Sequence, residues 1–293
     1  MPRENRNQQD AYEESGHMPQ LAFHRVDPER RIGLPAGRYT QPIQLTVIVL
    51  AGIITVAVYG GLALIPDHYI TQSLTQRGWV PRAIVVLTTW SLLILGCKVL
   101  KLRAQRKALR IRIIPDDPTF TLSLLNVESV LEDMFERVDR PRDFVLFNRV
   151  QLALSNLRNM RRISDVGEVL ESQANTDEAI FDSSYTVVRG LVWAIPVLGF
   201  IGTVLGLSAA IGEFGQVLSA ANDIETIKPA LQQVTGGLSV AFETTLQGLL
   251  GALGVQLILT FVRRAEEGFL DDCKEYCQRN IVNRLRILED SGG

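Results

Sequence analysis

Long stretches without charged residues constrain this chain more than any other feature of its sequence. The first of them, from Tyr39 to Pro66, contains no Asp, Glu, Lys or Arg. A helix needs about 20 consecutive apolar residues to cross the hydrocarbon core of a bilayer. We therefore predict a first membrane span over residues 41–66.

Three more apolar stretches predict three further spans. The second span, residues 79–100, contains the run AIVVLTTWSLLILGC between Arg82 and Lys98. It is short, so both cations must extend toward the membrane surfaces. The third span covers residues 188–213 and the fourth covers residues 236–262. Because no segment alternates apolar and polar residues as a strand does, we predict an all-α membrane protein with four transmembrane helices.

The basic residues in the connecting segments predict the orientation of these spans. The segment KVLKLRAQRKALRIR, at the end of the second span, has seven Lys or Arg and no acidic residue. The connections Asp67–Val80 and Glu213–Thr235 have one Arg and one Lys respectively. Since Lys and Arg are enriched in cytoplasmic loops, we expect both termini and the long middle segment to be cytoplasmic.

The remaining segments are predicted to lie outside the membrane. Residues 1–40 are expected to form a polar cytoplasmic tail, and residues 214–235 a periplasmic connection. Residues 101–187 contain two amphipathic patterns, TLSLLNVESVLEDMFERV and DFVLFNRVQLALSNLRNM, which predict a helical cytoplasmic domain. Residues 263–293 are expected to extend the fourth helix into the cytoplasm.

Charge and cysteine content argue against several classes of function. The formal net charge of −2 gives no broad electrostatic surface for nucleic acid. Cys273 and Cys277 would share a helix face, as a metal or redox pair or as reduced structural cysteines. With no second pair beside them, we favour the structural interpretation. We find no catalytic motif, and we expect no metal, no cofactor and no enzymatic activity.

Small residues form one narrow stripe on each of the last two spans. The stripe includes Gly199, Gly202 and Gly206 in the third span, and Gly248 and Gly251 in the fourth. Such stripes let membrane helices approach closely, so packing between these two spans explains them by itself. The first two spans lack the pattern and are expected to form a lipid-facing layer.

Polar residues on the same two spans add a second feature. Thr203 lies in the third span, and Thr244 and Thr245 lie in the outer half of the fourth. Glu243 stands beside them, although an ionised carboxylate within a span costs about 2.5–3.5 kcal/mol. It therefore faces water, a partner or a proton path, or it is protonated and bonded to a neighbouring helix.

The segments IPVLGFIGTVLGL and GGLSVAFETTLQGLLGAL together resemble the MotA/TolQ/ExbB family of ion-channel subunits. The resemblance covers about residues 189–264. It implies a homopentameric ring in the bacterial inner membrane, around a dimer of a single-span subunit of the ExbD, TolR or MotB type. A membrane Asp of that partner takes up and releases the proton, and ion flow drives mechanical work.

The resemblance also implies roles for single residues. Thr203 and Thr245 match the threonines of the ion path, and Pro196 matches a proline that kinks or hinges the third of these spans. Four spans resemble the flagellar stator branch, whereas the wording GTVLGL is closer to the transporter branch. Glu243 stands where the transporter branch is apolar, as an added proton-handling group.

The leading hypothesis is therefore a proton-conducting subunit of a membrane motor. Two alternatives stay open: a non-conducting scaffold with four spans, and a sodium-driven member of the same family. A small-solute transporter would show broken helices and internal repeats at mid-membrane, and neither is present in the sequence.

Overall fold

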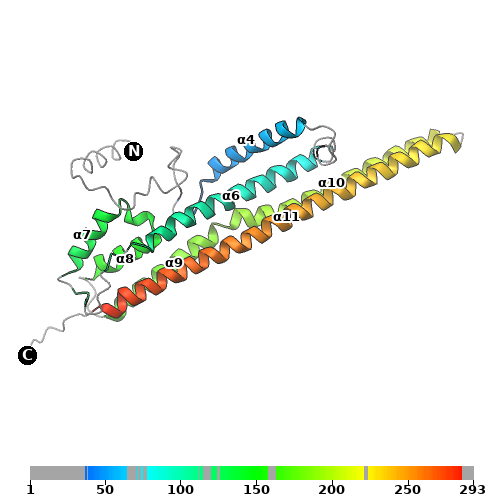
Figure 1. Ribbon diagram of the computed structural model, residues 1–293. Helices are drawn as coiled ribbons and strands as arrows, with labels where there is room; N and C mark the ends of the chain where they lie inside the picture. The colour runs from blue at the N-terminus through cyan, green and yellow to red at the C-terminus, as the bar shows by residue number, and fades with distance from the viewer. Residues whose placement is uncertain are drawn as a thin grey trace, which may run out of the picture. The chain divides into compact units, whose positions relative to one another are not determined.

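The computed structural model of the 293-residue chain describes residues 37, 39–64, 71, 74, 78–111, 113–114, 120–123, 126–157, 163–220 and 224–285 (Figure 1). Most of the predicted tail lies outside these residues. The described helices are α4 (Gln44–Ala63), α6 (Val80–Ala108), α7 (Val127–Arg137), η1 (Pro141–Asp143), α8 (Val145–Asn156), α9 (Ile163–Ser183), α10 (Thr186–Ala220), α11 (Ile224–Asn280) and η2 (Val282–Arg284). Within the described ranges, the only β-type pairing is an isolated bridge between Leu122 and Leu285. The predicted all-α class is confirmed for these residues.

Four helical stretches of the described chain are long and apolar enough to cross a membrane, and they are Gln44–Ala63, Val80–Ala108, Asp165–Gly212 and Val234–Arg284. They include α4 and α6 and most of α10 and α11. The helices continue beyond the apolar stretches. Helix α10 runs to Ala220 and α11 begins at Ile224, so most of the segment 214–235 is helical. Hydropathy marks the part of a helix that suits lipid, whereas the backbone hydrogen bonds that define the helix can continue into water.

The chain divides into two compact units. Unit 1 comprises residues 1–43, 97–184 and 263–293, and unit 2 comprises residues 44–96 and 185–262.

Unit 1 has a hydrophobic core built from amphipathic helices. On α7, the buried residues Val127, Val130 and Met134 recur at the helical spacing of one face. On α8, nearly all of the buried side chains are apolar, and Phe144 packs edge-on against Phe147 with ring centroids 5.8 Å apart. The α9 and α11 helices add further buried residues, which are Val166, Leu170, Phe181, Phe269, Leu270, Cys273 and Cys277.

A side chain from α6 fixes the start of α8. The amide of Gln105 donates from Nε2 to the carbonyl of Asp143 at 2.8 Å, and its Oε1 accepts from the backbone N–H of Val145 at 3.1 Å. The first N–H groups of a helix have no partner within the helix. Gln105 therefore satisfies one of them from a distant part of the chain.

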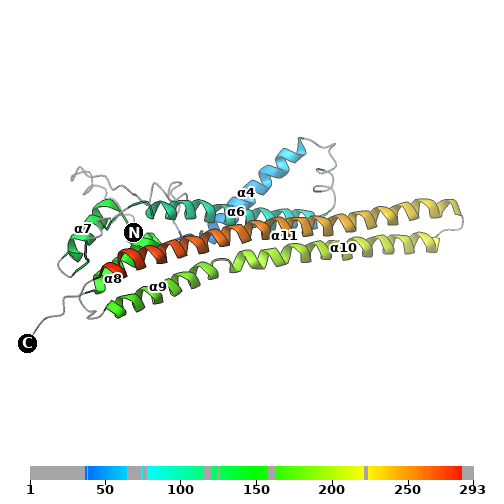
Figure 2. The same cartoon turned by 60° about the horizontal axis from the view of Figure 1, so that its bottom comes forward.

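Unit 2 is organised around the pair α10 and α11, which run antiparallel beside one another (Figure 2). Their contacts follow an antiparallel register: Gly199 lies against Gly248, Gly206 against Ala241, and Gly237 against Ala210. A small buried cluster of Val80, Ile84, Ile195 and Ala252 joins α6 to this pair.

Candidate functional site

Glycines bring the backbones of α10 and α11 into direct contact. A Cβ atom added at Gly199 would lie 3.0 Å from the carbonyl oxygen of Thr244 and 3.1 Å from the Cα of Thr245. A Cβ added at Gly248 would lie 3.0 Å from the carbonyl oxygen of Ile195. Backbone atoms move aside less readily than a flexible side chain, so these positions favour glycine. The stripe predicted from the sequence is a packing surface within one chain.

The α6 helix packs on the same surface through two further glycines. A Cβ at Gly202 would lie 2.6 Å from Oγ1 of Thr244 and 3.0 Å from Cγ1 of Val80. A Cβ at Gly251 would lie 3.0 Å from Oγ1 of Thr88. The second span therefore contacts the α10–α11 pair closely, at positions where those helices have no side chain.

Two threonine hydroxyls meet across this glycine contact. Oγ1 of Thr203 on α10 and Oγ1 of Thr245 on α11 are hydrogen-bonded to each other. The Thr203 hydroxyl also lies 3.1 Å from the carbonyl oxygen of Ala241 and 3.3 Å from that of Gly199. The Thr245 hydroxyl lies 3.0 Å from the carbonyl of Gly199. The structure thus joins the two threonines that the resemblance selects.

This hydroxyl pair has more acceptors than protons. Each threonine hydroxyl has one proton to donate and two lone pairs that accept. The protons of Thr203 and Thr245 can be directed to the carbonyls of Gly199 and Ala241 or along the bond between the two hydroxyls. Several donor arrangements are therefore compatible with one set of oxygen positions. A group of this kind can pass a proton or present oxygen ligands to a cation.

Thr244 shares an acceptor with the hydroxyl pair, the carbonyl of Ala241, whereas Glu243 lies on another side of α11. Thr244 is buried under Gly202, and its hydroxyl donates to the carbonyl of Ala241 in its own helix at 2.8 Å. Glu243 is half-buried. Side chains two residues apart in an α-helix point in directions that differ by about 200° around the helix axis. Glu243 and Thr245 therefore lie on different sides of α11. Helix geometry sets only the side of α11 on which this carboxylate lies, and its role in an ion path stays a prediction.

Pro196 lies inside α10, one turn before Gly199. Proline has no N–H, so it cannot donate the hydrogen bond that would stabilise this turn of the helix. The backbone is therefore locally weakened next to the close contact at Gly199. That location suits the hinge role that the resemblance implies.

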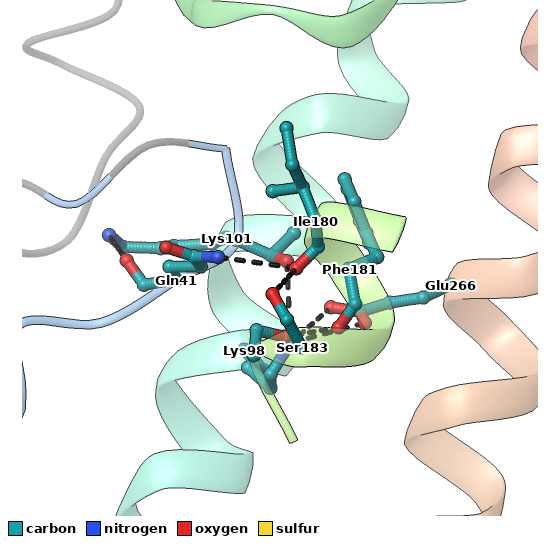
Figure 3. Close-up of polar contacts among 9 residues, drawn as sticks. Gln41, Lys98, Lys101, Ile180, Phe181, Ser183 and Glu266 are labelled. Atoms are coloured by element: carbon teal, nitrogen blue, oxygen red, sulfur yellow. Dashed lines mark hydrogen bonds and ion pairs between the residues drawn. The ribbon is translucent and has the colours of Figure 1, made fainter. Parts of the chain in front are cut away.

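A buried charged cluster in unit 1 was not singled out from the sequence (Figure 3). Nζ of Lys98 on α6 lies 3.1 Å and 3.2 Å from the two carboxylate oxygens of Glu266 on α11. The Lys98 ammonium also lies 3.5 Å from Oγ1 of Thr40 and 6.0 Å from the ring centroid of Phe181. Both charged side chains are almost fully buried.

The same cluster holds the segment that precedes α4. Lys101, one helical turn from Lys98, donates to the carbonyl of Gln41 at 2.8 Å. The side-chain amide of Gln41 donates to the carbonyl of Ile180 on α9 at 3.2 Å (Figure 3). In the sequence, Lys98 looked like an ordinary boundary charge of the second span, and no local signal pointed to Glu266 as its partner.

Cys273 and Cys277 are free cysteines inside the hydrophobic core of unit 1. Burial raises the pKa of both thiols, that of Cys277 to about 12. Among the residues that the structure describes, no group of three or more His, Cys, Asp or Glu is placed to hold a metal ion. The two thiols are packed as small hydrophobic side chains.

The four apolar helices define a multi-pass helical membrane protein. Residues 138–274 match the model of the MotA/TolQ/ExbB proton channel family. This region of the chain is similar to that family, which confirms the resemblance. The matched region contains α10 and the hydroxyl pair. Neither the curated proteins nor the solved structures include a match to this chain.

Proposed function

We propose that the protein is the channel-forming subunit of a proton-driven motor in a bacterial inner membrane, with both termini in the cytoplasm. One observation supports it most directly: the hydroxyls of Thr203 and Thr245 meet between two apolar helices inside the family region. In an apolar span, such a pair provides donors and acceptors where none would otherwise exist.

The exposed faces of α10 and α11 support assembly into a ring. Trp193, Phe200, Phe242 and Phe261 are each more than 60% exposed in the single chain. Lipid or further subunits must cover them in a membrane. We propose that five copies form the ring and that they surround a dimer of a single-span subunit with a membrane Asp.

The experiment is proton flux in proteoliposomes that contain the chain co-purified with the products of neighbouring genes. Thr203→Val and Thr245→Val preserve side-chain shape and remove the hydroxyls, so each should lower flux at least tenfold. Thr260→Val is the matched control, because the Thr260 hydroxyl is exposed and bonds its own helix at Gln256. Equal flux in all three variants would contradict the proposal.

Two further measurements separate the alternatives. Native mass spectrometry of the gently extracted complex should give five copies of this chain with two of the partner, whereas a monomer or dimer alone favours the non-conducting scaffold. Replacing the proton gradient by a sodium gradient distinguishes a sodium-driven complex.

A further inference from the structure

A cavity of about 360 Å³ lies within unit 1, between α8, α9 and the end of α11. Its walls include Arg149 from α8, three small or apolar residues of α9, and Cys277 from α11. The α9 residues are Gly167, Leu170 and Ala174. Sites for small molecules commonly have volumes of about 300–1,000 Å³, so the cavity has room for a small metabolite.

Arg149 is the most informative residue of this cavity. Its side chain is only 2% exposed, and it is one of the largest fully buried side chains of the described chain. Its Nε donates to Oδ2 of Asp177 at 2.8 Å. Oδ1 of Asp177 accepts instead from Nε2 of Gln173, also at 2.8 Å. Each oxygen of Asp177 is therefore already bonded to a different donor.

The hydrogen bond from Arg149 to Asp177 uses Nε, so the two terminal amino groups of the guanidinium are not engaged by this bond. Charged donors form the stronger hydrogen bonds of proteins when an acceptor is available. Because Arg149 lines the cavity, an acceptor placed there is within reach of its terminal amino groups. The planar fork of a guanidinium matches the geometry of a carboxylate or a phosphate.

Other polar groups around the cavity define the charge of the ligand. Lys274 and Gln278, one turn apart on α11, are exposed and supply further donors at its edge. Glu171, also exposed, lies on the α9 wall and would repel a large polyanion. Burial keeps the Cys277 thiol neutral by raising its pKa. Together, the donors Lys274 and Gln278 and the acidic Glu171 favour a ligand with a single oxyanion over a polyphosphate.

We propose that this cavity binds a small molecule with one carboxylate or phosphate group, held by the terminal amino groups of Arg149 and by Lys274. The site lies outside the threonine pair, in the unit that contains α8 and α9, and does not depend on the proposed ion path. A ligand here would join three helices of unit 1 and would add to the stability of that unit.

Acylation of lysines by an N-hydroxysuccinimide ester tests the proposal on the intact complex in nanodiscs. Mass spectrometry follows the rate at Lys274, with the exposed Lys107 of α6 as an internal reference. At constant ionic strength, millimolar inorganic phosphate or acetate should slow acylation of Lys274 at least threefold and leave Lys107 unchanged. Protection by phosphate alone identifies a phosphate group, and protection by acetate identifies a carboxylate.

Two glycine substitutions make a matched pair. An added Cβ at Gly167 or at Gly268 meets no atom within 4 Å, and only Gly167 lines the cavity. Gly167→Leu should fill the cavity and abolish the protection of Lys274, whereas Gly268→Leu should retain it. No protection in the unsubstituted chain, or equal protection in both variants, would overturn the proposal.

A double variant tests the role of Arg149 itself. Arg149→Leu alone would leave Asp177 buried without its cation and could prevent folding. Arg149→Leu combined with Asp177→Leu removes both charges and retains apolar volume. The folded double variant should show no protection of Lys274, and retained protection would rule out the guanidinium as the anion ligand.

Discussion

The ammonium of Lys98 and the carboxylate of Glu266 form a two-point ion pair, with side chains that are 0% and 2% exposed. They are 168 residues apart in the chain and come from different helices. A buried pair of this kind contributes little relative to apolar residues of the same size, but removing one partner leaves an uncompensated charge. The stability of unit 1 should therefore be sensitive to substitution of either residue of this pair.

Removing either partner alone should destabilise unit 1 strongly. For Glu266→Gln or Lys98→Met, we expect a loss of about 3–5 kcal/mol in the free energy of unfolding. The double variant Lys98→Met with Glu266→Leu should recover most of this loss, because neither member of the pair is then left buried without its partner. Denaturant unfolding in nanodiscs, followed by tryptophan fluorescence and by circular dichroism, measures the cycle.

An exposed pair on the same helix provides the control for this cycle. The side chains of Arg279 and Glu275 are 72% and 66% exposed, and Nη2 of Arg279 lies 2.6 Å from Oε1 of Glu275. Exposed pairs contribute about 0–1 kcal/mol, so Glu275→Gln should change stability by less than about 1 kcal/mol. A loss as large as that of Glu266→Gln would show that burial is not the cause.

Substitution of the contact glycines should separate α10 from α11. In Gly199→Ala and Gly248→Ala the new methyl group meets backbone atoms at 3.0–3.1 Å, and overpacking of this kind costs about 1–3 kcal/mol. Gly254→Ala is the control, because its Cβ meets nothing within 4 Å. Thermal unfolding should show a lowered Tm for the first two variants only. A lowered Tm for Gly254→Ala as well would mean that the contact distances do not explain the effect.

Glu243→Gln should leave assembly intact and reduce ion flux. The carboxylate is half-buried within an apolar helix, a location that is costly unless the group has a function. Flux in proteoliposomes measures the effect, and native mass spectrometry checks assembly. Flux equal to that of the unsubstituted chain would contradict a role for Glu243 in proton handling.

The thiol of Cys277 should not react in the folded protein near neutral pH. Burial raises its pKa from 9.0 to about 12, and the thiolate is the reactive form. Iodoacetamide at pH 8 should leave Cys277 unmodified until denaturant is added, as read by mass spectrometry. Because the folded pKa is raised, this group stabilises the fold below pH 9, and the contribution is lost as pH rises from 9 toward 12. Rapid alkylation of the native protein would contradict this assignment.

The α10–α11 contact could be predicted from the sequence because the spacing of small residues within each helix marks the face that packs. Small residues three or four apart leave one face on which helices can meet, and Gly199 and Gly248 do meet there. The amphipathic segments around α7 and α8 were equally recognisable from their periodicity. The roles of Thr203 and Thr245 in an ion path stay predictions.

Other features depend on long-range packing that one sequence does not reveal. Arg149 looks like any cation on an amphipathic helix, and only the fold shows that it is buried beside a cavity. Glu243 and Thr245 seemed to belong together because they are close in sequence. Helical geometry separates them, since residues two apart face different sides.

The hydroxyl pair of Thr203 and Thr245 has one more physical consequence. Its two bond dipoles can reverse direction without any movement of the backbone, because Gly199 and Ala241 offer alternative acceptors. An ion that passes nearby would therefore reorient these hydroxyl dipoles, whereas the surrounding apolar side chains have no dipole to reorient. The hydroxyl pair can therefore change its dipole direction at a close helix contact of unit 2.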